Sequence, residues 1–239
     1  MSRRGQSSVV GVALLLGVTI VSLGLLTAGI GTVVADNAAR ADARRVAVGF
    51  DSALRPVEIT GPYRGEVTFS EGSLRTVERD LRVLDGERVV ERVAVGGLVF
   101  ESGPHRTAYL AGGVVRGTGE AAWLATPPPV TASGRGDAGV LVVGAPTLGG
   151  TASVAGSGGV VVTLATNVSH DRVDLGTGRY RLAIETATPG AWERFFRERG
   201  ATVSRRTFDG DHTSSVVATF PGRRRAYLVV HDLGLEVVS

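Results

Sequence analysis

The residues of this sequence best suited to chemistry are its four histidines, three of which stand next to aspartates. Imidazole and carboxylate groups together are ligands for several divalent metal ions. The segments concerned are His105, His170-Asp171, Asp209-Gly210-Asp211-His212 and His231-Asp232. None of them has the spacing of an H-x-x-x-H motif or of an EF-hand loop. The sequence therefore favours polar residues of loops and strand ends, and it predicts no metal site.

The usual motifs of covalent and phosphoryl chemistry are absent from the sequence. It contains no cysteine, which excludes disulfides, thiolate metal sites and a cysteine nucleophile. It also has no G-x-S-x-G elbow, P-loop or protein-kinase signature. The segment 117–122 partly resembles a dinucleotide-binding loop, but Trp123 and the prolines at 127–129 prevent the helix that must follow such a loop. We therefore expect neither enzymatic activity nor a cofactor.

The charge distribution gives little sign of a nucleic-acid partner. The net charge is +3, and the 26 basic residues, all arginines, are scattered among 23 acidic residues. The densest basic clusters are only Arg205-Arg206 and Arg223-Arg224-Arg225. A nucleic-acid-binding domain concentrates its basic residues on one face or along one helix. We therefore expect solvated surface charge, the alternative being a small patch for an anionic partner.

Asn167 begins the tripeptide Asn167-Val168-Ser169, which is an acceptor sequon for N-linked glycosylation. Asn37 is the only other asparagine of the chain. Because sequons also arise by chance, Asn167 is a glycosylation candidate whose use requires an extracellular location.

The longest uncharged stretch of the chain lies near its N-terminus. No charged residue occurs from Gly5 to Ala35, between Arg3-Arg4 and Asp36. The 27 residues from Val9 to Ala35 would span roughly 40 Å as a helix, more than the ~30 Å hydrocarbon core of a bilayer. A secretory signal peptide has an apolar region of only ~7–15 residues and a small-residue cleavage site after it. The sequence therefore predicts a transmembrane helix whose partner is the lipid bilayer.

Helical periodicity continues beyond this apolar stretch. Pro56, the first proline of the chain, ends the pattern. The sequence therefore predicts one long helix that is apolar on all sides at first and amphipathic afterwards. The apolar residues that recur at roughly helical spacing in its second part are Ala39, Val46, Phe50, Ala53 and Leu54.

After Pro56 the hydrophobic period changes to two, and the 34 glycines of the chain indicate frequent turns. Asp85-Gly86 predicts a β-hairpin, because this pair tolerates the positive φ of a type I′ turn. The segment 126–139, rich in proline and glycine, is expected to be a loop. The predicted strands are 66–70, 81–84, 87–90, 98–100, 107–111, 121–125, 140–143, 160–166, 179–185, 216–220, 226–230 and 233–238.

One short internal helix is predicted, with Thr188 as its N-terminal cap and Gly200 at its end. Its aromatic residues occupy positions i, i+3 and i+4 and therefore share one face. They are Trp192, Phe195 and Phe196. This face is expected to pack on a sheet, the alternative being an exposed aromatic recognition site.

Together these patterns predict a long N-terminal transmembrane α-helix followed by a mainly-β head, built as a sandwich or a curved sheet, with one short packed helix. Three segments follow from the sequence. They are a basic leader at 1–5, the transmembrane helix with its amphipathic extension at 6–54, and a β-rich extracytoplasmic head at 57–239.

The residues directly before the apolar helix carry a further signal. Arg3-Arg4-Gly5-Gln6 places a basic pair, a glycine and a polar residue immediately ahead of the hydrophobic segment. Over residues 3–35 the chain resembles archaeal type IV pilins and archaellins with a class III signal, and its SSVVGVALLLGVTIV segment is similar to haloarchaeal pilin-like proteins. The resemblance implies cleavage between Gly5 and Gln6 by a prepilin-peptidase-type enzyme. It also implies contacts with other pilin-like subunits through the retained helix.

The resemblance leads to the prediction of a single-pass, membrane-anchored type IV pilin-like surface subunit, with its head outside the cell and the ability to join a filament. The alternative is an uncleaved single-span anchor that carries a binding or sensor domain. Charge alone leaves the topology open, because Arg40, Arg44 and Arg45 follow the apolar stretch closely. The positive-inside rule leans weakly toward a cytoplasmic head, whereas the resemblance favours an external one.

Overall fold

The computed structural model describes residues 4–54, 60–134 and 139–238. Its helices are α1 (Arg4–Ala53), the single 3₁₀ turn η1 (Gly119–Ala121) and α2 (Pro189–Glu198). Its strands are β1 (Gly61–Val77), β2 (Asp80–Asp85), β3 (Arg88–Ala94), β4 (Gly97–Ser102), β5 (His105–Leu110), β6 (Gly113–Arg116), β7 (Trp123–Thr126), β8 (Val130–Ser133), β9 (Gly139–Thr147), β10 (Ser153–Gly178), β11 (Tyr180–Glu185), β12 (Thr202–Arg206), β13 (Ser215–Thr219), β14 (Arg224–Asp232) and β15 (Glu236–Val238).

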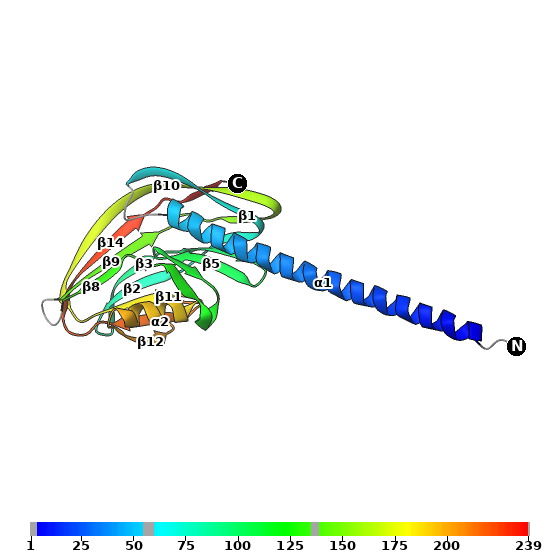
Figure 1. Cartoon of the computed structure of the whole chain (residues 1–239). Helices are drawn as coiled ribbons and strands as arrows, with labels where there is room; N and C mark the ends of the chain where they lie inside the picture. The colour runs from blue at the N-terminus through cyan, green and yellow to red at the C-terminus, as the bar shows by residue number, and fades with distance from the viewer. Residues whose placement is uncertain (1–3, 55–59, 135–138, 239) are drawn as a thin grey trace. The chain divides into compact units, whose positions relative to one another are not determined.

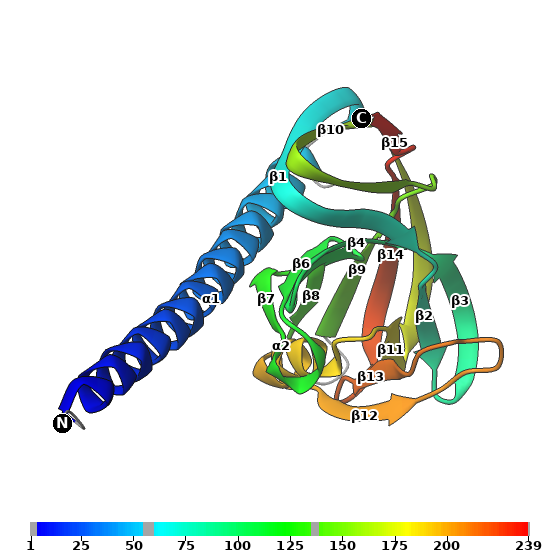
Figure 2. The same cartoon turned by 90° about the vertical axis from the view of Figure 1, so that its right-hand side faces the viewer.

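These strands form two sheets. The larger sheet has ten strands in the order β7-β6-β5-β4-β1-β10-β14-β9-β8, with β15 paired to β10. The smaller sheet has five strands in the order β12-β13-β11-β2-β3. Neighbouring strands in the described parts of the chain pair antiparallel, except that β14 runs parallel to β9. Figure 2 shows β1 and β10 as long, strongly curved strands at the centre of the larger sheet.

The larger sheet is covered on both faces. In β5 and β6, Tyr109 and Val114 pack in the same cluster as the second half of α1. Their neighbours Leu110 and Val115 pack in a different cluster, together with the smaller sheet and α2. Since successive side chains of a strand point to opposite faces, the second half of α1, the larger sheet and the smaller sheet form three layers. The structure thus confirms a long N-terminal helix followed by a mainly-β head with one short packed helix.

The two halves of α1 have different surroundings. Among the described residues, α1 is the one helix that is long and apolar enough to cross a membrane, by its length and composition. In its first half, large apolar side chains such as Leu15 and Leu25 are about 70% exposed. The chain divides into two compact units at Ala38 and Ala39. The amphipathic part of the helix, predicted as an extension of the anchor, is therefore part of the head.

A buried carboxylate joins α1 to β1. Asp42 is 1% exposed, and its Oδ2 accepts hydrogen bonds from the backbone N–H groups of Ser70 and Glu71 at 2.8 and 3.2 Å. Its Oδ1 accepts one from Arg45 at 2.7 Å. The register of β1 against β10 shifts between Phe69 and Glu71, and such a bulge interrupts the regular ladder of a sheet. Asp42 thus satisfies backbone donors at the point where the ladder is interrupted.

The aromatic face of helix α2 belongs to a core cluster that also contains residues of both sheets, and the helix lies next to β12 (Figure 1). Its Trp192 and Phe196 are fully buried and Phe195 is 4% exposed, so the aromatic face packs inside the head, as predicted. The cap prediction is wrong in one respect. Thr188 occupies the N-cap position, but its hydroxyl lies 3.1 Å from the hydroxyl of Thr186 and makes no bond to the helix.

Several strand boundaries differ from the sequence-based prediction. The predicted hairpin forms, but its two-residue loop is Gly86-Glu87, one position later, with Gly86 at φ +61°. The predicted loop at 126–139 contains strand β8, while residues 135–138 lie outside the described residues. Strand β10 is 26 residues long and far exceeds the predicted 160–166, because its first part pairs with β1, and locally with β15, while its second part pairs with β14.

Candidate functional site

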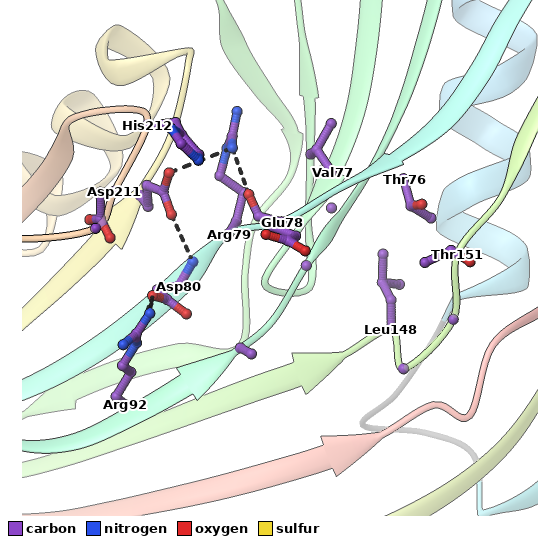
Figure 3. A pocket seen from close by; sticks show the side chains of 17 residues that line it. Thr76, Val77, Glu78, Arg79, Asp80, Arg92, Leu148, Thr151, Asp211 and His212 are labelled. Carbon is purple, nitrogen blue, oxygen red and sulfur yellow. Dashed lines mark hydrogen bonds and ion pairs between the residues drawn. The ribbon is translucent and has the colours of Figure 1, made fainter.

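A charged cleft lies where the chain passes between the two sheets. Glu78 and Arg79 connect β1 of the larger sheet to β2 of the smaller one, and Gly96 lies between β3 and β4 on the return. The end of β11, the β9–β10 connection and the β12–β13 loop complete the walls. The cleft has a volume of about 480 Å³ and is lined mainly by polar and charged side chains (Figure 3).

Three carboxylates converge at this cleft. The oxygen atoms of Asp80, Glu185 and Asp211 lie within 4.8 Å of one another, which is the spacing of a possible cation site. Asp80 begins β2, Glu185 ends the neighbouring β11, and Asp211 comes from the β12–β13 loop. The backbone N–H of Asp80 donates to Glu185 Oε2 at 3.2 Å and thereby fixes the two chain segments together.

Arginines neutralise these carboxylates. Arg82 donates to both oxygens of Asp211 at 2.6 and 2.8 Å, and to Asp80 at 2.7 Å. Arg92 also binds Asp80, at 2.6 and 2.7 Å, and Arg79 lies 3.5 Å from Glu185. Carboxylates already held by guanidinium groups are poor ligands for a metal ion, because a cation would have to displace the arginines. The cluster therefore acts as a buried ionic network, and its exposed rim offers hydrogen bonds to a polar ligand.

Glu185 is the carboxylate of this network whose arginine partner lies farthest away, at 3.5 Å. Burial raises its pKa, and the nearby charges of Asp211 and Asp80 raise it further, while Arg79 opposes the rise. A raised pKa in the folded state means that the native protein binds this proton more tightly than the unfolded chain does. The stabilising contribution of Glu185 is therefore present at pH values below its ordinary pKa and is lost as pH rises through the folded-state pKa.

Glu185→Gln is expected to gain stability relative to the wild type as pH rises from about 4 to 7, because glutamine keeps an acceptor without the buried charge. Glu193→Gln is the matched control with the opposite sign. Hydrogen bonds from Arg205 and Arg197 lower the pKa of Glu193, so its contribution is lost as pH falls. Melting temperatures of both variants at the two pH values check this, and parallel behaviour of the two variants would contradict it.

The structure brings together only two of the four histidines. His170 on β10 and His231 on β14 are directly opposed, with their Nδ1 atoms 2.8 Å apart. Burial, with a smaller effect of His170, lowers the pKa of His231 to about 4. His212 lines the charged cleft beside Asp211, whereas His105 begins β5. The remaining aspartates of these segments, Asp171, Asp209 and Asp232, are exposed.

The other predicted site residues lie on the surface or in α1. Asn167 is an exposed residue of β10 at the edge of a shallow hollow of about 400 Å³, which Arg64 and Glu236 also line. Gly5 and Gln6 lie in the first turn of α1, which begins at Arg4. None of these three described residues is among those that line the charged cleft.

The carboxylates of the cleft, apart from Asp211, were not anticipated from the sequence. One signal is nevertheless present there. The predicted strand around 81–84 carries Arg82 between apolar residues, and an arginine on a buried strand requires an acidic partner. The identity of that partner depends on strand order, because Asp211 lies 129 residues away in the chain.

The fold and the cleft define a protein with an exposed apolar helix and a three-layer head that encloses an ionic cluster. The family model described as "Family of unknown function (DUF7289)" matches residues 4–236, and the chain belongs to this family. No curated protein and no solved structure matches the chain.

Proposed function

We propose that the chain is a membrane-anchored, type IV pilin-like surface subunit whose leader is removed between Gly5 and Gln6. The observation that carries the proposal is that the two halves of α1 have different surroundings. Its first half exposes apolar side chains on all sides, and its second half is part of the core of a β-rich head. A helix that is apolar all round needs lipid or other apolar helices around it.

The leader supports this proposal over a plain anchor. Arg3-Arg4-Gly5-Gln6 stands immediately before the apolar segment, so that cleavage after Gly5 leaves the whole helix attached to the head. The retained helix then holds the subunit in the bilayer, or packs against the helices of other subunits in a filament. The protein needs no catalytic residue for this role.

The second candidate is an uncleaved, single-span anchor that displays a binding domain. The charged cleft favours this reading, since Arg92 and His212 at its rim can donate hydrogen bonds to a polar ligand. The two candidates share the anchor and differ in whether the leader is removed. Whether the leader is cleaved therefore distinguishes the two candidate functions.

Expression of the full chain in an archaeal host with an active prepilin-peptidase-type enzyme is expected to give a mature protein that starts at Gln6. Gly5→Phe should block this cleavage, because such enzymes cut after a small residue. Gly11→Phe, a matched change within the helix, should leave it unaltered. N-terminal sequencing of membrane fractions checks these outcomes, and a wild-type chain that keeps Met1 or Ser2 would favour the uncleaved anchor.

Glycosylation of Asn167 belongs to the same proposal, because it requires the head to lie outside the cell. The exposure of Asn167 on β10 supports its access to a modifying enzyme. The intact mass of the processed protein then exceeds the mass of the polypeptide. Asn167→Gln removes this excess, whereas Asn37→Gln, which changes the other asparagine outside any sequon, retains it. A head on the cytoplasmic side gives no excess in either variant.

A further inference from the structure

The opposed histidines of β10 and β14 are close enough for both to bind one metal ion. His170 and His231 are cross-strand partners in the larger sheet, so the two backbones hold their side chains side by side. Their Nδ1 atoms are 2.8 Å apart, and their rings are nearly perpendicular, at 82°. His231 is 6% exposed, whereas His170 is exposed to solvent, so an ion can reach the pair from outside.

Thr60 completes the arrangement. Its hydroxyl lies 3.0 Å from Nε2 of His170. Without a metal, one Nδ1 donates a hydrogen bond to the other, because two protonated nitrogens cannot approach so closely. When His170 binds a metal through Nδ1, its proton resides on Nε2 and is donated to Thr60 Oγ1. No proton is lost from a neutral pair in this exchange, and a hydrogen bond on the second ring nitrogen is typical of metal-ligating histidines.

The distance between the two nitrogens is compatible with both of them binding one metal ion. Metal–imidazole bonds are about 2.0–2.1 Å long, so two ligands at a right angle place their nitrogens about 2.9 Å apart. A tetrahedral angle would require about 3.3–3.4 Å. The hydrogen bond holds the nitrogens 2.8 Å apart in the metal-free protein, which is close to the separation of adjacent ligands in a square-planar or tetragonal site, the geometry of Cu²⁺ and Ni²⁺. Cu²⁺ also forms the stronger complexes of the two with nitrogen ligands.

We propose that His170 and His231 form a two-histidine site for Cu²⁺, with Thr60 orienting His170. The proposal departs from the sequence-based prediction of no metal site, and it is independent of the proposed pilin-like function. Within the described parts of the chain, the one group of three potential ligand side chains is the arginine-bound cluster of the cleft, so the described residues supply two ligands here.

The test titrates Cu²⁺ into the tag-free full chain in detergent at neutral pH and follows the reaction by calorimetry and by electron paramagnetic resonance. One ion per chain is expected, with a spectrum of two nitrogen ligands. His170→Asn and His231→Asn should each weaken binding by at least about tenfold, and Thr60→Val by on the order of tenfold. His105→Asn and His212→Asn are matched controls that should retain the wild-type affinity.

Two further measurements keep the result interpretable. Melting curves in the presence of a chelator show whether each variant is folded, and His170→Asn changes an exposed side chain, so it tests the site even where His231→Asn fails to fold. Ni²⁺ and Zn²⁺ should both bind more weakly than Cu²⁺. Undiminished binding in His170→Asn, a one-nitrogen spectrum, or tighter binding of Zn²⁺ than of Cu²⁺ would overturn the proposal.

Discussion

Trp192→Ala is expected to lower the free energy of unfolding of the head by about 3–5 kcal/mol, as for other fully buried aromatic residues. Trp192 has no exposed surface, and its ring lies 6.1 Å from that of Phe196 and 6.3 Å from that of Phe195. Helix α2 has only ten residues, so its packing, rather than its intrinsic helicity, keeps it folded. Removal of the indole therefore leaves a cavity and loosens the helix that carries it.

The chain provides a matched control in its second tryptophan. Trp123 on β7 is 46% exposed and contacts Arg116 at its surface, so Trp123→Ala should cost about 1 kcal/mol or less. Trp192→Phe is a second control. It retains most of the apolar volume and removes an indole N–H that has no hydrogen-bond partner among the described residues. Urea denaturation of the three variants measures the contrast, and equal losses for both alanine variants would refute the core role of α2.

Phe50→Ala in α1 is expected to destabilise the head by a comparable amount, about 3–5 kcal/mol. Phe50 and Val46 are completely buried and pack in one cluster with Val67, Phe69 and Leu164 of the larger sheet. The second half of α1 therefore acts as a core element of the head. Denaturant unfolding of the detergent-solubilised chain measures the loss.

Val48→Ala is the control for this prediction, because Val48 lies on the same helix but is 70% exposed. Its effect should stay within about 0.5 kcal/mol. The same structure predicts the behaviour of fragments. A fragment of residues 36–239 retains the buried face of α1 and should fold, whereas one of residues 56–239 loses it and should not. A cooperative melt of the shorter fragment at the wild-type temperature would contradict this role of α1.

The sequence was sufficient to predict those elements whose hydrophobic pattern lies within a short stretch of the chain. The uncharged stretch and the spacing of Val46 and Phe50 predicted α1, and Trp192, Phe195 and Phe196 predicted the buried face of α2. The boundaries of β10 were not predictable in the same way. Its 26 residues include several glycines, and their extended conformation depends on partner strands that lie far away in the chain.

The candidate sites also depend on strand pairing between distant parts of the chain, which the sequence alone does not give. Asp211 and His212 were recognised as candidate ligands, but the link from Asp211 to Arg82 depends on the order of strands in the smaller sheet. His170 and His231 were likewise noted separately, since nothing local to either residue gives the antiparallel register that opposes them. Long-range strand pairing, rather than residue type, thus decides which polar groups meet.

The pairing of β1 with β10 also has a consequence for the order of folding. Gly61 is opposite Val168, and Val67 is opposite Val162, so the sheet that covers the buried face of α1 needs residues made about a hundred positions later. Contacts between such distant segments form slowly. During synthesis the apolar face around Phe50 emerges early, and residues of β1, β4 and β5 can cover only part of it before β10 is made. The head therefore completes this part of its core only after most of the chain has been made.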